Sequence, residues 1–104
     1  MKVRPSDAEV RLVVTALGEG RKNATPRAQL AATVEMDDRR VRACIEAARR
    51  DGKFIISSNN GYYIATEPEE IERQYRIDRA RALSILARLT PMRRYLRAAG
   101  RDVK

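Results

Sequence analysis

The chain has 104 residues, which suits a single domain, and its 22 Lys and Arg side chains outnumber the 14 Asp and Glu side chains, for a net charge of +8. That charge favours a polyanionic partner, with nucleic acid the first candidate. With no His and one Cys, the sequence excludes Ser-His-Asp and Cys-His nucleophiles and most transition-metal cages, so we expect no enzyme, no cofactor and no small-molecule ligand.

The sequence also predicts a cytoplasmic protein that does not contact a membrane. No apolar run is long enough to cross a bilayer, and residues 1–9 lack the apolar core of a signal peptide. Cys44 lies among helix-periodic apolar residues and is expected to be a buried thiol in a reducing compartment. Residues 1–65 carry 12 basic and 8 acidic side chains and residues 66–104 carry 10 and 6, so the charge is interpreted as evenly spread.

Two helices are expected first. One begins at a cap formed by Ser6 or Asp7 and buries a stripe of residues with a spacing near 3.6: Val10, Val13, Val14 and Leu17. Thr25-Pro26 predicts the start of the second, over residues 26–34, with the Thr25 hydroxyl as the cap and Pro26 as the first helical residue.

The third helix is expected over residues 38–51, after an acidic start at Asp37 and Asp38. At about 100° per residue, its inward residues are Val41, Cys44, Ile45 and Ala48. The outward residues are Arg39, Ala43, Glu46 and Arg50, flanked by Arg40, Arg42 and Arg49. Glu46 could accept a hydrogen bond from cytosine, but the favoured expectation is an ion pair with Arg42 or Arg50 at four-residue spacing. A face so rich in arginine favours contact with a negative partner over a merely solvated surface.

The stretch ISSNNGYYIA, residues 56–65, predicts a β-hairpin with Asn59 and Asn60 at its polar tip, where Asn and Gly tolerate positive φ. Ile55 and one of Tyr62 and Tyr63 should point inward. A long helix is expected next, starting with a capping box between Thr66 and Glu69. Its apolar face comprises Ile71, Tyr75, Ala82, Ile85, Leu86 and Leu89. Thr90-Pro91 should break it, leaving a short terminal helix and a frayed tail after about residue 98.

Three helices followed by a hairpin are the order of a winged helix-turn-helix domain. Residues 25–65 contain Leu30-Ala31, Val41-Arg42, Ile45, Arg49, Gly52 and Gly61-Tyr62. Through these residues the segment resembles the N-terminal DNA-binding domain of the biotin repressor and related transcription regulators. The chain is also similar to small winged-helix proteins of phage and prophage, in which GYYIA leads into an acidic helix start and a long helix containing an Arg-Ala segment, here within 79–82. Two departures are VEMDD, in place of a Gly or Ser between helices two and three, and Ala48, in place of Leu.

The resemblance implies a mainly α fold with a small β-hairpin. The winged helix-turn-helix would occupy residues 1–65, and residues 66–104 would form a helical extension packed on the same domain. It further implies sequence-specific binding of double-stranded DNA by a transcription regulator or a phage-type DNA-binding factor. Helix 38–51 would enter the major groove, with the hairpin 54–65 near the backbone or the minor groove. The expected DNA-contacting residues are Arg39, Arg40, Arg42, Ala43, Arg49, Arg50, Lys53, Arg27, Asn59 and Asn60.

Other functions stay open at this point. The fold could serve as a protein-interaction module, or as a replication accessory that binds nucleic acid without sequence preference, and double-stranded RNA is a third possible ligand. The long last helix could pack within the monomer or form a homodimer, which would suit a palindromic DNA site.

Overall fold

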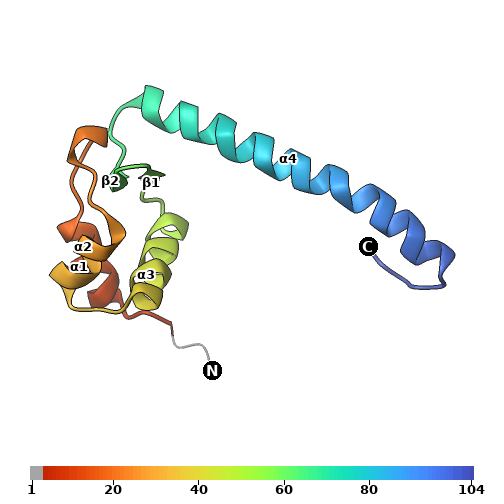
Figure 1. Cartoon of the computed structure of the whole chain (residues 1–104), viewed down its shortest axis with the longest axis horizontal. Helices are drawn as coiled ribbons and strands as arrows, with labels where there is room; N and C mark the ends of the chain where they lie inside the picture. Colours follow the sequence, from red (N-terminus) through yellow and green to blue (C-terminus); the bar gives the residue numbers. More distant parts are fainter. Residues whose placement is uncertain (1–3) are drawn as a thin grey trace. The chain divides into compact units, whose positions relative to one another are not determined.

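The computed structural model describes residues 4–104 and is mainly helical, with one two-stranded antiparallel hairpin (Figure 1). The elements in chain order are α1 (Asp7–Ala16), the 3-10 turn η1 (Arg21–Asn23), α2 (Arg27–Val34), α3 (Asp38–Arg50), β1 (Ile55–Ser58), β2 (Gly61–Ile64) and α4 (Pro68–Ala98). The predicted mainly helical class, with a hairpin and a long last helix, is confirmed.

The chain divides into two compact units. The first ends at Ile71, so that it includes the first turn of α4, and the second covers Glu72–Lys104. The predicted boundary after residue 65 and the packing of residues 66–104 on the preceding part stay predictions. Residues 1–3 lie outside the described residues. They belong to the predicted domain and to the segment that was expected to lack the apolar core of a signal peptide.

A capping box fixes the start of α1, where Ser6 is the N-cap. The Glu9 backbone N–H donates to Ser6 Oγ at 3.1 Å, and the Ser6 N–H donates to Glu9 Oε1 at 2.9 Å. These two bonds satisfy backbone donors that the first helical turn leaves without an intrahelical acceptor. The helix then buries Val13 and Leu17, as the apolar spacing predicts.

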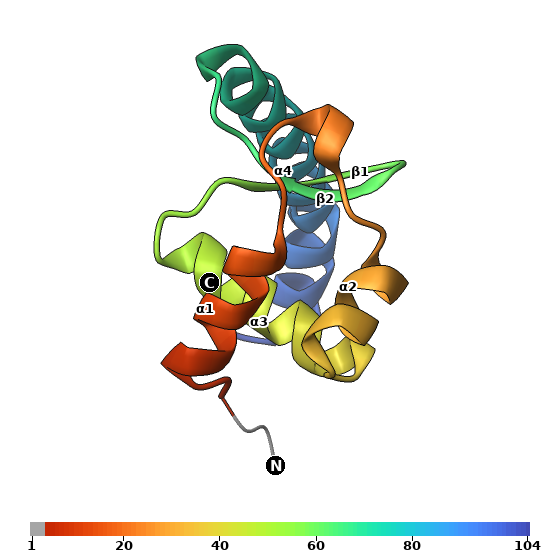
Figure 2. The same ribbon diagram turned by 90° about the vertical axis from the view of Figure 1, so that its left-hand side faces the viewer.

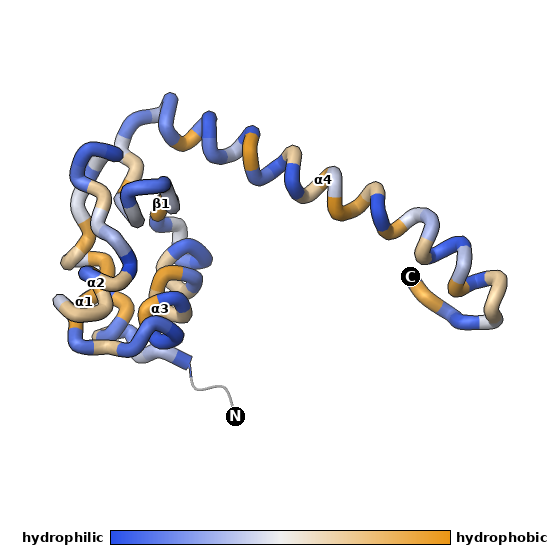
Figure 3. Tube along the Cα trace, viewed as in Figure 1, coloured by the Kyte–Doolittle hydropathy of each residue, from blue (hydrophilic) through white to orange (hydrophobic). Residues whose placement is uncertain are grey.

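The main core lies between the first three helices, whose apolar residues gather on their facing sides (Figure 3). Leu30 and Val34 contribute from α2. All four predicted inward residues of α3 are buried: Val41, Cys44, Ile45 and Ala48, each at most 1% exposed. Because this narrow stripe fixes the rotation of α3 about its axis, the opposite side of the helix faces solvent.

The start of α2 differs from the prediction. Pro26 is the N-cap and accepts no side-chain capping bond. Thr25 instead pairs its backbone with β2: its N–H donates to the Tyr62 carbonyl at 2.8 Å and its carbonyl accepts from the Tyr62 N–H at 2.9 Å. The predicted Thr25 cap is therefore wrong, because an extended Thr25 can satisfy both of its backbone groups against the hairpin. Figure 2 shows this segment passing the hairpin before α2.

The hairpin uses both of its faces. The pairs Ile55–Ile64, Ile56–Tyr63, Ser57–Tyr62 and Ser58–Gly61 set its register. Ile55 is buried in the main core, with Tyr62 packed against it. Ile56 and Tyr63 point the other way, into a second cluster with Ala65, Ala24 and Ile71. The sequence predicted one inward tyrosine, but a second apolar cluster lets each tyrosine serve a different face.

The turn of the hairpin also differs in detail. Among the described residues, Glu35 is the only non-glycine with positive φ, so Asn59 and Asn60 do not use the left-handed conformation. Gly61 takes that role instead, with φ of 119°.

The last helix begins and continues differently from the prediction. Its first turn is capped by Glu70, whose Oε1 accepts from the N–H groups of Thr66 and Glu67 at 3.3 Å each, so the predicted Thr66–Glu69 pairing is wrong. The predicted break at Pro91 is also wrong, since α4 runs through it to Ala98. Pro91 leaves the Ala87 carbonyl without its usual donor, but both residues are exposed, so water can solvate that carbonyl.

Candidate nucleic-acid interface

The outward side of α3 presents a row of cationic side chains. Arg39, Arg42 and Arg50 are exposed on this side, and Ala43 and Arg49 are half-buried. Lys53, three residues after the end of α3, is also exposed but borders a shallow groove beside α1. This arrangement follows from the buried stripe of α3, which turns the arginine-rich side away from α1 and α2. The helical periodicity of the sequence therefore predicted correctly which side of α3 is exposed.

Three of these cations have no internal partner. Within residues 4–104, the side chains of Arg39, Arg50 and Lys53 take part in no ion pair or hydrogen bond. They are fully available to an external anion. The other cationic residues that were predicted to contact DNA each have a partner within the protein.

Arg40 joins α3 to α1. Its Nη2 donates to Glu9 Oε1 at 2.7 Å and its Nε donates to Glu9 Oε2 at 3.1 Å, a two-pronged pairing across 31 positions of sequence. The hydrogen bonds from Arg40 and from the Ser6 backbone hold the pKa of Glu9 at about 2, below its ordinary 4.5. Arg40 therefore has a structural role here, and its contact with DNA stays a prediction.

Arg49 joins α3 to the hairpin. Its Nε donates to the Ile55 carbonyl at 3.0 Å, and its Nη1 pairs with Glu46 Oε1 at 2.6 Å. The prediction that Glu46 pairs with Arg42 or Arg50 is wrong, because the carbonyl at the start of β1 holds the Arg49 guanidinium within reach of Glu46.

The acidic residues at the start of α3 are occupied as well. Asp37 caps the helix by accepting the Arg40 N–H at 2.7 Å, which confirms its predicted place at the helix start. Asp38 pairs with Arg27 of α2 and lies 3.8 Å from Arg42 Nε. Hydrogen bonding to Tyr62 and the Asp38 charge raise the pKa of Arg27. The two carboxylates that could repel a phosphate are thus largely offset by neighbouring groups.

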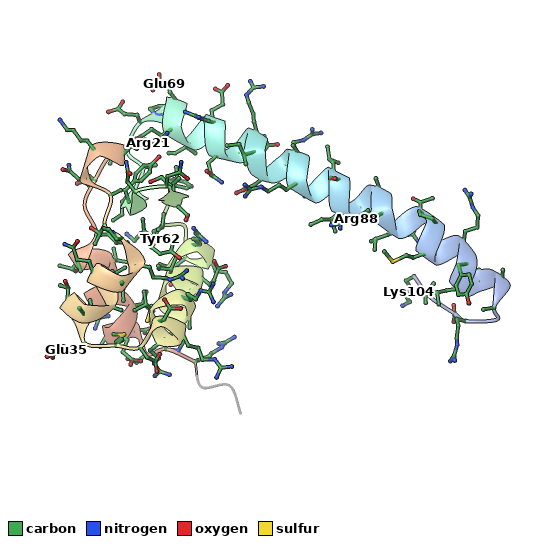
Figure 4. All side chains as sticks on the ribbon, viewed as in Figure 1. Arg21, Glu35, Tyr62, Glu69, Arg88 and Lys104 are labelled. Atoms are coloured by element: carbon green, nitrogen blue, oxygen red, sulfur yellow. The ribbon has the colours of Figure 1, made fainter. Side chains whose placement is uncertain are left out.

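A shallow groove of about 460 Å³ separates the start of α2 from the hairpin tip. Its lining residues are Pro26, Arg27, Ser57, Ser58, Asn59, Asn60, Gly61 and Tyr62. The exposed Asn59 and Asn60 form its rim, and Ser58 Oγ donates to the Gly61 carbonyl at 2.9 Å, which orders the turn. Tyr62, labelled in Figure 4, lies between the hairpin and the helices. The groove brings Arg27 together with both predicted asparagines.

The charge of the chain is uneven when it is divided at the boundary between the compact units. Residues 1–71 hold 12 basic and 11 acidic side chains, a net charge of +1, whereas residues 72–104 hold 10 and 3, a net charge of +7. A division after residue 65 gives equal net charges for the two parts, because it counts three glutamates near the start of α4 with the last segment. Most of the basic excess therefore belongs to α4 and the residues after it.

Comparison of the chain with protein-family models, with curated proteins and with solved structures gives no match. Within residues 4–104, no helix is both long enough and apolar enough to cross a membrane, and no cluster of three or more His, Cys, Asp or Glu side chains could hold a metal ion. The geometry and charge of the α3 surface are therefore the strongest indications of function.

Proposed function

We propose that the protein is a winged helix-turn-helix protein that binds double-stranded DNA in a sequence-specific manner, as a transcription regulator or a phage-type DNA-binding factor. In this proposal α3 is the recognition helix in the major groove and the β1–β2 hairpin is the wing. The observation that carries it is the presence of two unpaired cations, Arg39 and Arg50, on the outward face of α3, where Glu46 is already paired with Arg49; the unpaired Lys53 follows the helix. A cytoplasmic location and the absence of enzymatic activity stay predictions.

The roles of the side chains follow from their positions. Arg39 and Arg50 are eleven residues apart, which is about 16 Å along a helix, so they can address guanine edges at opposite ends of one site. Arg42 and Lys53 would neutralise phosphates, and the small Ala43, which shares the outward face with Arg39 and Arg50, would let the helix approach the bases. Arg27, Asn59 and Asn60 border the groove at the hairpin tip, where a backbone phosphate or the adjacent minor groove would lie.

The test is a binding titration with the variant Arg39→Ala/Arg50→Ala, first on random duplex DNA and then on sites selected from a sequence pool. Removal of each bidentate pair should cost about 1–3 kcal/mol on a selected site, with a much smaller loss on random DNA. The matched variant Arg39→Lys/Arg50→Lys keeps the charge but loses the planar fork, so it should lose preference for the selected site while retaining random binding. Equal affinity of the parent and the alanine variant for the selected site would reject the assignment.

A second candidate function is supported by the net charge of +7 on residues 72–104. Such a segment would bind nucleic acid through counterion release without reading its sequence, as a replication accessory or architectural protein does. Selection from the sequence pool separates the two functions, because a strong consensus supports the regulator and tight binding without a consensus supports the non-specific role.

A further inference from the structure

The exposed apolar side chains of α4 form a seam with the spacing of a coiled coil. Successive positions alternate between three and four residues: Tyr75, Asp78, Ala82, Ile85, Leu89, Met92 and Leu96. We infer that α4 pairs through this seam with α4 of a second copy of the chain, and that the two helices run antiparallel. This inference is independent of DNA binding by α3.

The seam exists because the helix continues through Pro91. A break at that residue would separate Met92 and Leu96 from Ile85 and Leu89, whereas one continuous helix places all four on one side. At 100° per residue, Ala87 lies opposite the seam and Pro91 lies roughly 150° from its centre, so neither residue interrupts it. On the flank between Pro91 and the seam, a shallow hollow of about 420 Å³ is lined by Pro91, Met92, Tyr95 and Leu96.

The seam is too apolar to suit a solvated helix. No residue of α4 is buried. Ile85 is 50% exposed, Met92 54% and Tyr75 63%. Figure 3 shows apolar positions recurring along the whole helix. Burying such a row against an identical one removes apolar surface from water at about 25 cal/mol per Å².

Asp78, the single charged residue in the seam, decides the orientation. In a parallel pair each seam residue faces its own copy, so two Asp78 carboxylates would meet between the helices and repel. Arg88 and Arg93 flank the seam. In an antiparallel pair Asp78 faces an apolar seam residue from the other half of the partner helix, close to that partner's flanking arginines.

The charges at the two ends of α4 favour the same orientation. Its first turns carry Glu69, Glu70 and Glu72, while the last turns and the residue beyond them carry Arg93, Arg94, Arg97 and Arg101. An antiparallel pair brings the acidic end of each copy beside the basic end of the other. A parallel pair brings like charges together at both ends, and it also aligns the helix dipoles unfavourably.

Light scattering on the full chain tests self-association. The parent should have twice the monomer mass at micromolar concentration, and Ile85→Lys should have the monomer mass because it places a cation in the seam opposite an apolar residue. Leu83→Lys is the matched control, since Leu83 is 48% exposed but lies about 120° away from the seam. It should remain dimeric. A parent of monomer mass, or equal masses for the two lysine variants, would overturn the inference.

Spin labels on introduced cysteines test the orientation. Burial raises the pKa of the Cys44 thiol, so the parent should resist labelling and serve as the control. In an antiparallel pair the labels of Ser84→Cys, near the middle, should lie close together, while those of Arg97→Cys should lie about 30–40 Å apart at 1.5 Å per residue. Short distances for both variants would identify a parallel pair and overturn the orientation.

Discussion

Glu9 bonds to two parts of the molecule at once. Its carboxylate accepts the hydrogen bond from the Ser6 N–H that closes the capping box of α1. The same carboxylate accepts hydrogen bonds from Nε and Nη2 of Arg40 in α3. The start of one helix is thereby tied to the start of another, and the free side of α3 is held in place without using Arg39 or Arg50. A residue in the first turn of α1 thus supports the proposed DNA-binding surface from behind.

The Glu9–Arg40 pair should make stability depend on pH in acid. Because the folded-state pKa of Glu9 is about 2 and its ordinary value is 4.5, its contribution is complete above about pH 4.5 and is lost as the pH falls toward 2. In that interval Glu9→Gln should lower the slope of the unfolding free energy against pH. The decrease should correspond to at most about one fewer proton taken up on unfolding, measured by urea denaturation at several pH values. Glu19→Gln is the control, and equal slopes for these two variants would contradict the assignment.

The hairpin is the element that unites the first compact unit. Ile55 packs into the core of the three helices, while Ile56 and Tyr63 pack against Ala24 and the first turn of α4. The backbone bonds between Thr25 and Tyr62 join it to the segment before α2. A polar hairpin tip near a DNA backbone can therefore be positioned precisely by a base that is held on both sides.

Gly61 is the most sensitive point of that attachment. A Cβ at this position would overlap the Thr25 carbonyl group, and its φ of 119° is strained for any L side chain. We expect Gly61→Ala to lower the free energy of unfolding by about 2–4 kcal/mol, from backbone strain together with displacement of the Thr25 segment. Gly52→Ala is the matched control, since its φ is 93° but no atom lies within 4 Å. It should cost only about 1–2 kcal/mol, and equal losses in chemical denaturation would disprove the contact.

In the whole molecule, most of the net charge and the proposed DNA-reading surface lie in different units. The first unit, with a net charge of only +1, carries the unpaired Arg39 and Arg50 of α3, whereas residues 72–104 carry a net charge of +7. We therefore expect overall affinity for nucleic acid to depend strongly on the second unit and preference for a DNA sequence to depend on the first.

A variant of α4 checks this division. Arg73→Gln/Arg94→Gln removes two charges that lie away from the seam, the same number that Arg39→Ala/Arg50→Ala removes from α3. It should lower the salt dependence of binding by about 0.9 in the log–log slope for each phosphate that is no longer neutralised, while leaving the ratio of selected-site to random affinity unchanged. A fall in that ratio, measured by fluorescence anisotropy, would contradict the division.

The sequence predicted the features that depend on local periodicity. The buried sides of α1 and α3, the hairpin and the exposure of Arg39 and Arg50 all follow from spacings within one element. The pairing of Arg40 with Glu9 and of Thr25 with Tyr62 joins residues more than 30 positions apart, and no local pattern indicates either. Pro91 misled the prediction because a proline ends a helix only where its lost hydrogen bond cannot be replaced, and here water can reach the Ala87 carbonyl.

The turn between α2 and α3 shows the same limit. Glu35 ends α2 in the left-handed conformation, with φ of 55°, at a place where a glycine would be expected. Its N–H reaches the Ala32 carbonyl at 3.3 Å and the next N–H, of Met36, reaches the Ala31 carbonyl at 3.1 Å. The half-buried Met36 packs against the core. The turn therefore forms without glycine, and the replacement noted in VEMDD does not prevent it.

The hairpin leaves little room for another strand to add to it. On one flank, the N–H and carbonyl groups of Tyr62 and Ile64 are already bonded to Thr25, Gly18 and Gly20. On the other flank, carbonyls alternate in direction along β1, and because the Phe54 carbonyl bonds to Ala65, the Ile55 carbonyl points outward, where the Arg49 guanidinium covers it. The β2 margin of this small sheet and the Ile55 end of its β1 margin are thus protected against intermolecular β-pairing and aggregation.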